Sequence, residues 1–199
     1  MGKIQLELFK EIKKNGSSRS LRGALTRFAV LCHHIRPQKC RAYVQNLLPY
    51  LTKIAKRTEE SLHETLAHSL EKILPVLGYF TNDNEIRGLL KAFLPNVNHS
   101  SASMRRSATS CLMLLCQHSR KPRFFLLWML DAILQMLLPI QKEKSNSLIL
   151  GSLLVLRSLA PHFPKLSAPE TKLAAQSFFD KGGGSKDVDI LLSYDQVLQ

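Results

Sequence analysis

A two-residue mark recurs along most of this 199-residue chain at nearly constant spacing. Serine followed by leucine or methionine occurs at intervals of 41, 42 and 44 residues, beginning at Ser20, Ser61, Ser103 and Ser147. In a leucine-rich chain with few β-branched residues, such a period favours repeated helical units. One unit cannot bury its apolar face alone, so the repeat predicts that the units stack on one another.

Each mark opens an apolar stripe with helical spacing. Successive stripe residues are four, three and four positions apart, which places them on one face of an α-helix. The strict alternation of a half-buried strand is absent. The stripes therefore predict four helices with one buried face each, and the predicted core residues are Leu21, Leu25, Phe28, Leu62, Leu66, Met104, Ala108, Cys111, Leu148 and Val155.

Capping residues and prolines divide the repeats into helix pairs. Ser17 or Ser18, Asn82 with Glu85, and the serines at 100, 101 and 145 suit helix N-termini. The predicted pairs are 3–15 with 18–35, 38–56 with 59–79, 83–97 with 101–118, and 122–140 with 145–162. Two helices in about 40–47 residues are typical of HEAT and armadillo repeats. The predicted fold is all-α, an α-solenoid of HEAT-like antiparallel helix pairs.

The chain changes in composition after the fourth pair. We expect residues 1–162 to form the solenoid, and residues 163–187 to form a linker containing proline, glycine and a short helix. Residues 188–199 resemble the start of an incomplete fifth unit. Apolar faces at both ends of the stack predict that the isolated chain is marginally stable or self-associates.

Positive charge is concentrated in the first half of the chain. The net charge is +13, and residues 1–57 carry thirteen lysines and arginines against Glu7 and Glu11. This block suits acidic proteins or an anionic membrane surface, although solvated helix faces would give the same pattern. Tyr43 and Tyr50 are its only tyrosines, and it has no tryptophan, which does not support a base-stacking platform for nucleic acid. The candidate partner-binding residues are Lys13, Lys14, Arg19, Lys53, Lys56, Arg57, Arg105 and Arg106.

Arg105 also falls in a repeat column with Arg22, His63 and Ile149. Ladder arginines of HEAT proteins pair with acidic residues of neighbouring turns, and no aspartate stands before the serine marks at 20, 61 or 103. Three interpretations of Arg105 and Arg106 therefore stay open, which are a ladder, a solvated face and a partner contact.

The sequence patterns of enzymes and metal sites are missing. The glycine run at 182–184 precedes Ser-Lys, the wrong order for a phosphate loop, and indicates a linker. Cys32 and Cys111 lie in core stripes and match no paired metal-ligand spacing. The apolar run 124–140 contains Asp131 and Pro139, which favours a buried helix over a membrane span. We expect no catalysis, no metal, no cofactor and no small-molecule substrate.

Several longer phrases of the sequence are distinctive, and these are the stretches Gln5–Gly16, Arg36–Arg41, Asn82–Ile86, Leu89–Phe93 and Cys116–Arg120. Together they resemble the N-terminal HEAT region of the huntingtin family. The resemblance runs from about residue 4 to residue 161, and its wording favours an invertebrate form and a fragment of a longer chain. It implies a non-catalytic scaffold that binds proteins in vesicle and axonal transport, autophagy and transcriptional regulation.

The resemblance also implies partners and a location. The implied partners are neighbouring HEAT units of a longer chain and a huntingtin-associated protein, and the location is the cytoplasm and also the nucleus. Two other functions fit a basic solenoid, because fold alone does not settle function. One is nucleic-acid binding, and the other is a transport-receptor-like adaptor.

Overall fold

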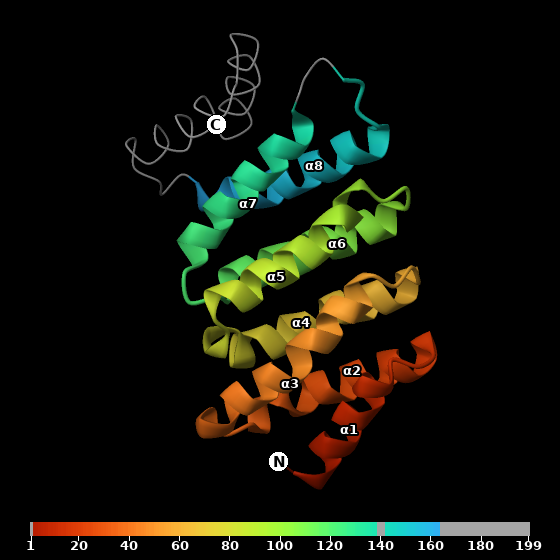
Figure 1. The fold of residues 1–199 in the computed structure, drawn as a ribbon, viewed down its shortest axis with the longest axis vertical. Helices are drawn as coiled ribbons and strands as arrows, with labels where there is room; N and C mark the ends of the chain where they lie inside the picture. Colours follow the sequence, from red (N-terminus) through yellow and green to blue (C-terminus); the bar gives the residue numbers. More distant parts are fainter. Residues whose placement is uncertain (1, 139–141, 164–199) are drawn as a thin grey trace.

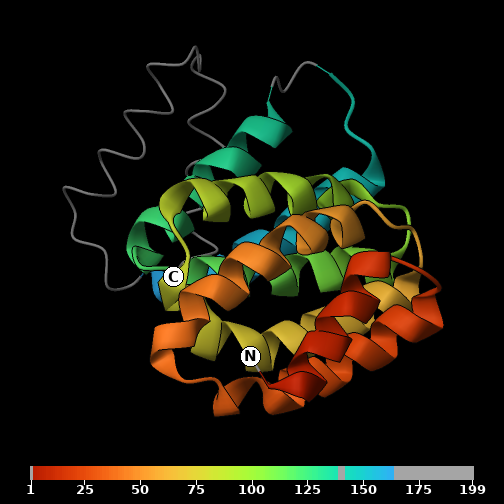
Figure 2. The ribbon, with the colours of Figure 1, turned by 60° about the horizontal axis from the view of Figure 1, so that its bottom comes forward.

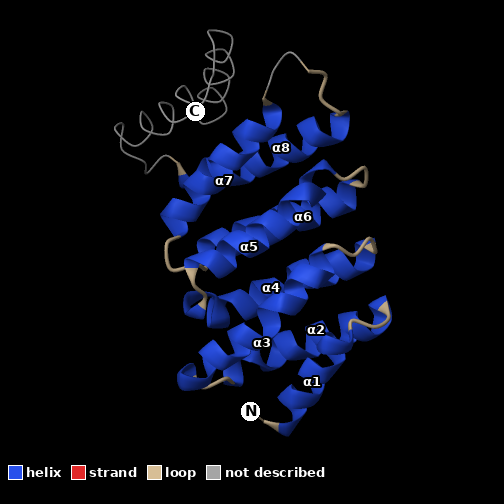
Figure 3. Cartoon of the chain, in the orientation of Figure 1, coloured by secondary structure: helices blue, strands red, loops and turns tan. Residues whose placement is uncertain are grey.

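The computed structural model describes residues 2–138 and 142–163, and within these ranges the chain is built of helices and loops without strands (Figure 3). The linker and fifth unit predicted after residue 163 lie outside the described residues. The α-helices are α1 (Lys3–Lys14), α2 (Ser18–Leu31), α3 (Pro37–Ala55), α4 (Glu60–Leu77), α5 (Asp83–Phe93), α6 (Ala102–Gln117), α7 (Pro122–Leu137) and α8 (Asn146–Leu159). Short 3-10 helices follow four of them, and these are η1 (Cys32–His34), η2 (Gly78–Phe80), η3 (Leu94–Asn98) and η4 (Ala160–His162).

The predicted helix starts agree closely with the structure. Ser17, Ser101 and Ser145 each accept a hydrogen bond from a first-turn backbone N–H, and Asn82 forms a capping box with Glu85. Each cap satisfies N–H groups that have no partner inside the helix. Serine caps therefore begin the second helices α2, α6 and α8, and an asparagine cap begins the first helix α5.

Several helix ends differ from the prediction. α2 and α5 end earlier, at Leu31 and Phe93, and the chain continues as the 3-10 helices η1 and η3. Pro95 lies in the first turn of η3, where its missing N–H leaves no α-helical bond unmade. Pro49 lies inside α3, and the helix continues past it to Ala55. Tighter 3-10 turns are common at such helix ends.

The four helix pairs stack along one axis as an α-solenoid, with the first pair at one end and the fourth at the other (Figure 1). Successive second helices pack extensively, α2 on α4, α4 on α6 and α6 on α8. Among the first helices, α3 packs on α5, and α1 touches α3 over a smaller area. Figure 2 looks from the N-terminal end and shows the pairs behind one another. The predicted all-α solenoid of HEAT-like pairs is confirmed.

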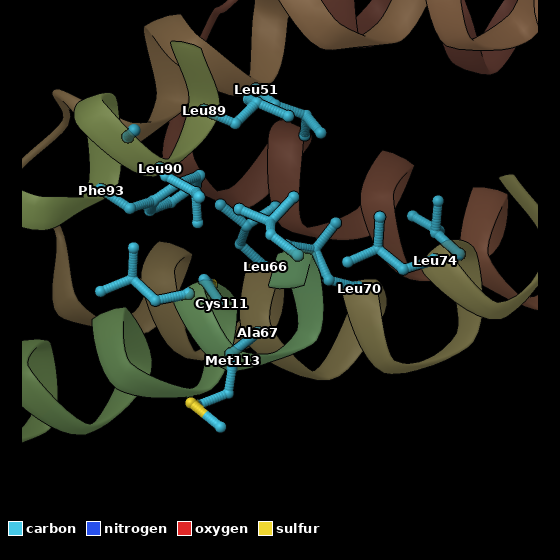
Figure 4. Packing of buried hydrophobic residues seen from close by; sticks show 14 of the residues in the cluster. Leu51, Leu66, Ala67, Leu70, Leu74, Leu89, Leu90, Phe93, Cys111 and Met113 are labelled. Carbon is cyan, nitrogen blue, oxygen red and sulfur yellow. The ribbon is translucent and has the colours of Figure 1, made fainter. Parts of the chain in front are cut away.

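The apolar stripes meet in one continuous core. The predicted residues Leu21, Leu25, Phe28, Leu62, Leu66, Met104, Ala108, Cys111 and Val155 are all buried. Figure 4 shows part of this core, where Leu51 of α3, Leu66 and Leu70 of α4, Leu90 of α5 and Cys111 of α6 converge. Leu148 is the exception, because it lies in the first turn of α8 beside a loop and is only half-buried.

Turns gather at two opposite edges of the solenoid (Figure 3). The turns inside helix pairs, at 15–17, 56–59, 94–101 and 142–145, form what we call the pair-loop edge. The turns between pairs, at 32–36, 78–82 and 118–121, form the between-pair edge. Because each helix runs from one edge to the other, a residue near a helix end belongs to one edge.

Candidate protein-interaction surface

The structure brings the predicted basic residues to the pair-loop edge. Lys13 and Lys14 end α1, and Arg19 lies in the first turn of α2. Lys53, Lys56 and Arg57 lie at the end of α3 and in the following turn, and Arg105 and Arg106 lie near the start of α6. Residues far apart in sequence therefore share one edge, since successive pairs repeat the same turn.

On the first two helix pairs, four of these cations are exposed and have no carboxylate within ion-pair distance among the described residues. They are Lys13, Arg19, Lys53 and Lys56. The Lys53 ammonium lies 5.1 Å from the centroid of the Tyr50 ring, a cation–π contact that leaves the charge in solvent. Lys14 differs, because its ammonium lies 3.0 Å from Glu11 and this bond lowers the pKa of the Glu11 carboxyl.

Arg57, another of the candidate partner-binding residues, joins the turns of two helix pairs through hydrogen bonds inside the protein. Its guanidinium donates to the Asn15 and Gly16 carbonyl oxygens at 3.2 and 2.9 Å. These bonds cross the interface between the first and second helix pairs, and we call each interface between successive pairs a joint. It also donates to Glu59 at 2.6 Å, and this hydrogen bond lowers the pKa of the Glu59 carboxyl to about 2. With its donors used inside the protein, Arg57 leaves the candidate surface.

Arg105 is also engaged inside the protein. Its guanidinium donates to the carbonyl oxygens of His99 and Ser100 at 2.9 and 2.8 Å. His63, in the same repeat column, lies with Nε2 2.6 Å from the carbonyl oxygen of Arg57. Both residues stand fourth in their helix and reach a carbonyl six positions earlier. His63 and Arg105 thus anchor the preceding loops through backbone oxygens, whereas Arg22 of the same column donates to the Thr65 hydroxyl at 3.1 Å.

Arg106 is exposed, but its surroundings are acidic. It lines a hollow of about 250 Å³ between α4 and α6 together with Glu64, His68 and Glu71. The Ser103 hydroxyl donates to Glu64 at the rim of this hollow. Arg106 therefore faces a mixed surface and does not extend the basic block of the first two pairs.

Sequence reasoning missed the polar contacts that join successive pairs. Arg41 of α3 makes two hydrogen bonds, of 2.8 and 2.9 Å, to the Glu85 carboxylate of α5. Arg120 donates through Nε to the carbonyl oxygen of Tyr79 at 2.7 Å. These partners are 44 and 41 residues apart, one repeat period, so the interval itself was the available signal.

The described residues hold no cluster of three or more metal-ligand side chains. Cys32, Cys40, Cys111 and Cys116 are buried free thiols, and burial raises the pKa of Cys32, Cys111 and Cys116 to about 12. Thiols with such a pKa carry almost no thiolate at neutral pH, the form that binds metals and attacks electrophiles. Among the described helices, none has the length and apolar character that a bilayer crossing requires.

The sequence comparisons agree with this architecture. A family model described as "Huntingtin, N-terminal HEAT 1" matches residues 1–121. Huntingtin of Takifugu rubripes is 49% identical over 197 residues, which cover 99% of this chain and 6% of that protein. The "HD protein homolog" of Dictyostelium discoideum is 35% identical over 107 residues, 53% of this chain and 4% of that protein. The chain thus spans a small part of the length of these relatives, and it belongs to the huntingtin family.

Proposed function

We propose that this segment is a non-catalytic scaffold unit that binds acidic proteins through the pair-loop edge of its first two helix pairs. The observation that carries the proposal is the row of exposed cations Lys13, Arg19, Lys53 and Lys56. Two successive turns present them, and the Arg57 bonds to Asn15 and Gly16 tie these turns together. A basic surface on tethered turns can meet a partner without first ordering its loops.

Acidic proteins fit this edge better than the other anionic partners. Glu59 and Glu60 follow Lys56 in the second of the two turns and at the start of α4, so the edge is not uniformly positive. When both partners carry charges of both signs in complementary positions, those charges fix how the two proteins align and exclude wrong partners. A lipid surface or a phosphate backbone would be repelled by those carboxylates. An anionic membrane surface and nucleic acid are outcomes that the test separates, and a transport-receptor-like adaptor role is the remaining alternative.

Apolar ends support a place in a longer stack. Ile4 and Val30 are 68% and 49% exposed and line an apolar groove of about 530 Å³ on the first pair. At the other end, Leu150 and Leu153 of α8 are 53% and 52% exposed. Neighbouring HEAT units would cover such faces, as in other solenoids. Within that longer chain, the proposed contexts are vesicle and axonal transport, autophagy and transcriptional regulation in the cytoplasm and nucleus, together with the huntingtin-associated partner.

Charge reversal tests the proposal. The variant Lys13→Glu, Arg19→Glu, Lys53→Glu, Lys56→Glu is compared with Lys39→Glu, Lys72→Glu, Lys91→Glu, Arg157→Glu, which changes the net charge equally at exposed sites elsewhere. Immobilised chains are incubated with cytosolic extract, and the acidic proteins retained are quantified by mass spectrometry. We expect the first variant to lose most of them and the second to keep them, with equal helicity by circular dichroism.

Two further probes separate the alternatives. Phosphatidylserine vesicles and a single-stranded 15-nucleotide DNA are titrated against the same variants. Binding to DNA that falls steeply with salt would favour the nucleic-acid alternative, because each phosphate contact releases counterions. Equal retention of acidic proteins by both charge-reversed variants would show that the pair-loop edge is not the binding surface.

A further inference from the structure

The between-pair edge carries a polar hollow that the proposed scaffold surface does not use. It has a volume of about 620 Å³ and lies where the α4–α5 turn meets the α6–α7 turn. The lining consists of amides and charged groups, from Asn82, Asp83, Asn84, Arg87, Arg120 and Lys121. Its lining residues come from the start of α5 and from the two turns that flank the third pair, and the packing of α5 on α6 brings them together.

Both guanidinium groups that line the hollow make cation–π contacts with exposed aromatic rings. The Cζ atom of Arg120 lies 5.2 Å from the centroid of the Tyr79 ring, and its Nε donates to the Tyr79 carbonyl oxygen. The Cζ atom of Arg87 lies 5.7 Å from the centroid of the Phe124 ring. Tyr79 and Phe124 are 65% and 45% exposed, although large aromatic side chains are usually buried. The rings restrict the arginine side chains in advance, which lowers the entropy lost when a ligand binds.

The charges of the hollow do not balance. Three cations, Arg87, Arg120 and Lys121, face one carboxylate, and that carboxylate (Asp83) lies 2.7 Å from Lys121. No described carboxylate lies within ion-pair distance of Arg87 or Arg120. A guanidinium presents parallel N–H donors that match a carboxylate, and arginine and aromatic residues dominate binding energy at protein interfaces.

We propose that this hollow binds an acidic peptide segment of a partner protein, with aspartate or glutamate carboxylates accepting hydrogen bonds from Arg87 and Arg120. The rims formed by Tyr79 and Phe124 would contact the apolar atoms of the same segment. The volume is comparable to ligand pockets of roughly 300–1,000 Å³ and fits a few side chains. The occupant is therefore a short extended segment.

The shape of the site favours a peptide over a membrane. A bilayer surface is met by protruding cationic tips, whereas these cations line a concavity with an acidic residue inside it. Nucleic acid needs open aromatic faces for base stacking, and guanidiniums already lie over both rings. The site lies on the between-pair edge, whereas Lys13 and Lys53 lie in the last turns of α1 and α3, on the opposite pair-loop edge. The ends of α1 and α3 can be followed in Figure 1.

The test uses the full chain and a fluorescein-labelled octaglutamate peptide, with octaglutamine as the neutral probe and fluorescence anisotropy as the readout. The variant Arg87→Gln, Arg120→Gln removes both guanidiniums. The matched control, Lys72→Gln, Lys91→Gln, removes the same charge from exposed sites outside both surfaces. We expect the arginine variant to bind octaglutamate about tenfold more weakly, the effect of losing roughly 1.4 kcal/mol, and the lysine control to bind within about twofold of the unmodified chain.

A second variant should change the affinity for octaglutamate in the opposite direction. Asp83→Asn removes the single carboxylate and releases Lys121, so we expect about two- to threefold tighter octaglutamate binding. A misfolded protein would not bind more tightly, which separates this result from a loss of structure. Equal weakening by the arginine and lysine pairs, or unchanged binding by the Asp83 variant, would overturn the proposal.

Phosphatidylserine vesicles complete the experiment. If the hollow were a membrane contact, vesicles would bind in an Arg87- and Arg120-dependent manner while octaglutamate would not, and the proposal would fail. If the hollow binds octaglutamate while charge reversal at the pair-loop edge does not reduce the retention of acidic proteins, only the proposed scaffold surface is refuted. The two proposals therefore fail separately.

Discussion

The first joint lies between the first and second helix pairs, and the last joint lies between the third and fourth. The same repeat positions are occupied by different side chains at the two joints. At the first joint, the ring centroids of Phe9 and Phe28 lie 5.0 Å apart, and Tyr43 lies 5.2 Å from Phe9. At the last joint, Val155 of α8 occupies the repeat position that Phe28 occupies in α2. Ser152 likewise occupies the position of Leu25. Gly151 precedes Ser152, and a Cβ on this glycine would overlap the carbonyl oxygen of Val97 in η3.

The comparison shows two ways to close a joint. Large aromatic side chains fill the space between helices at one end, whereas small residues let the backbone of α8 approach η3 at the other. Both give close packing, which is what the free energy of folding requires. They differ in the kind of substitution that damages them, because the aromatic joint loses packing when a side chain is truncated and the other joint clashes when a side chain is added.

The largest expected effect is at the aromatic joint. Phe28→Ala should lower the free energy of unfolding by about 3–5 kcal/mol, because it removes a fully buried ring and leaves a cavity. Urea unfolding followed by circular dichroism measures this change. Val155→Ala, at the same column position of the last joint, should cost less because fewer atoms are removed. Equal losses would show that the two joints are not packed differently.

Gly151→Ala should be the next most damaging change, costing about 3 kcal/mol by overpacking. The added Cβ meets a backbone oxygen, and a main chain held by its neighbours cannot rotate aside as a flexible side chain can. Gly88→Ala in α5 is the matched control, because its Cβ would meet nothing within 4 Å. The control should unfold at the same or higher urea concentration, and a tolerant Gly151 would show that the backbone contact is loose.

Much of the architecture could be predicted because burial and capping depend on residue type. The four-three-four spacing located the core columns, and side-chain oxygens at Ser17, Asn82, Ser101 and Ser145 located helix starts. Helix ends were less predictable, since 3-10 turns such as η3 need no distinctive residue. Leu148 had the expected type in the expected column, and only its place beside a loop leaves it half-buried.

The candidate site could be predicted only in part. Exposed lysines near turns, such as Lys13 and Lys53, were identified because turns lie on the surface. The bonds of Arg57 and Arg105 to backbone carbonyl oxygens were not predictable, because every residue carries a carbonyl and no sequence pattern reveals which one is bound. The pairing of Arg120 with Tyr79 likewise depends on how two repeats stack.

The polar tethers of the two joints should differ in strength. Arg57→Ala should cost about 1–3 kcal/mol, since it removes charge-assisted bonds and leaves the carbonyl oxygens of Asn15 and Gly16 without this donor. At the last joint, Ser145 donates to Asn98 at 2.8 Å, a neutral bond, so Asn98→Ala should cost about 0.5–1.5 kcal/mol. Urea midpoints of the two variants measure the difference. Lys56→Ala, at an exposed site, should change little.

Acid should weaken the turn of the first joint. Burial lowers the pKa of His63, whose Nε2 donates to the Arg57 carbonyl oxygen, with Glu59 and His99 as the other nearby titratable groups. The unfolded chain therefore binds a proton near pH 6.5 and the folded chain at lower pH, so stability is complete above about pH 6.5 and falls below it. The loss is at most about 1.4 kcal/mol per pH unit.

Urea midpoints between pH 7.5 and 5 measure the acid effect. His63→Gln should flatten this dependence, whereas His68→Gln should not, since the His68 side chain is 80% exposed. The Glu59 carboxyl contributes at lower pH. Its pKa is lowered to about 2, so its stabilisation is present above about pH 4.5 and is lost as the pH falls further. An unchanged slope in His63→Gln would contradict the assignment.

The smallest expected effect has the opposite sign and comes from the glycine at the first joint. Gly23 is the sixth residue of α2, as Gly151 is of α8, but its Cβ would lie 3.7 Å from the flexible side chain of Arg27, an ordinary contact. Alanine lowers the entropy of the unfolded chain and favours helix, so Gly23→Ala should raise the free energy of unfolding by about 0.5–1 kcal/mol. The same substitution would then stabilise one joint and damage the other. Destabilisation by both variants would mean that α2 also packs by close backbone approach, and the contrast between the joints would fail.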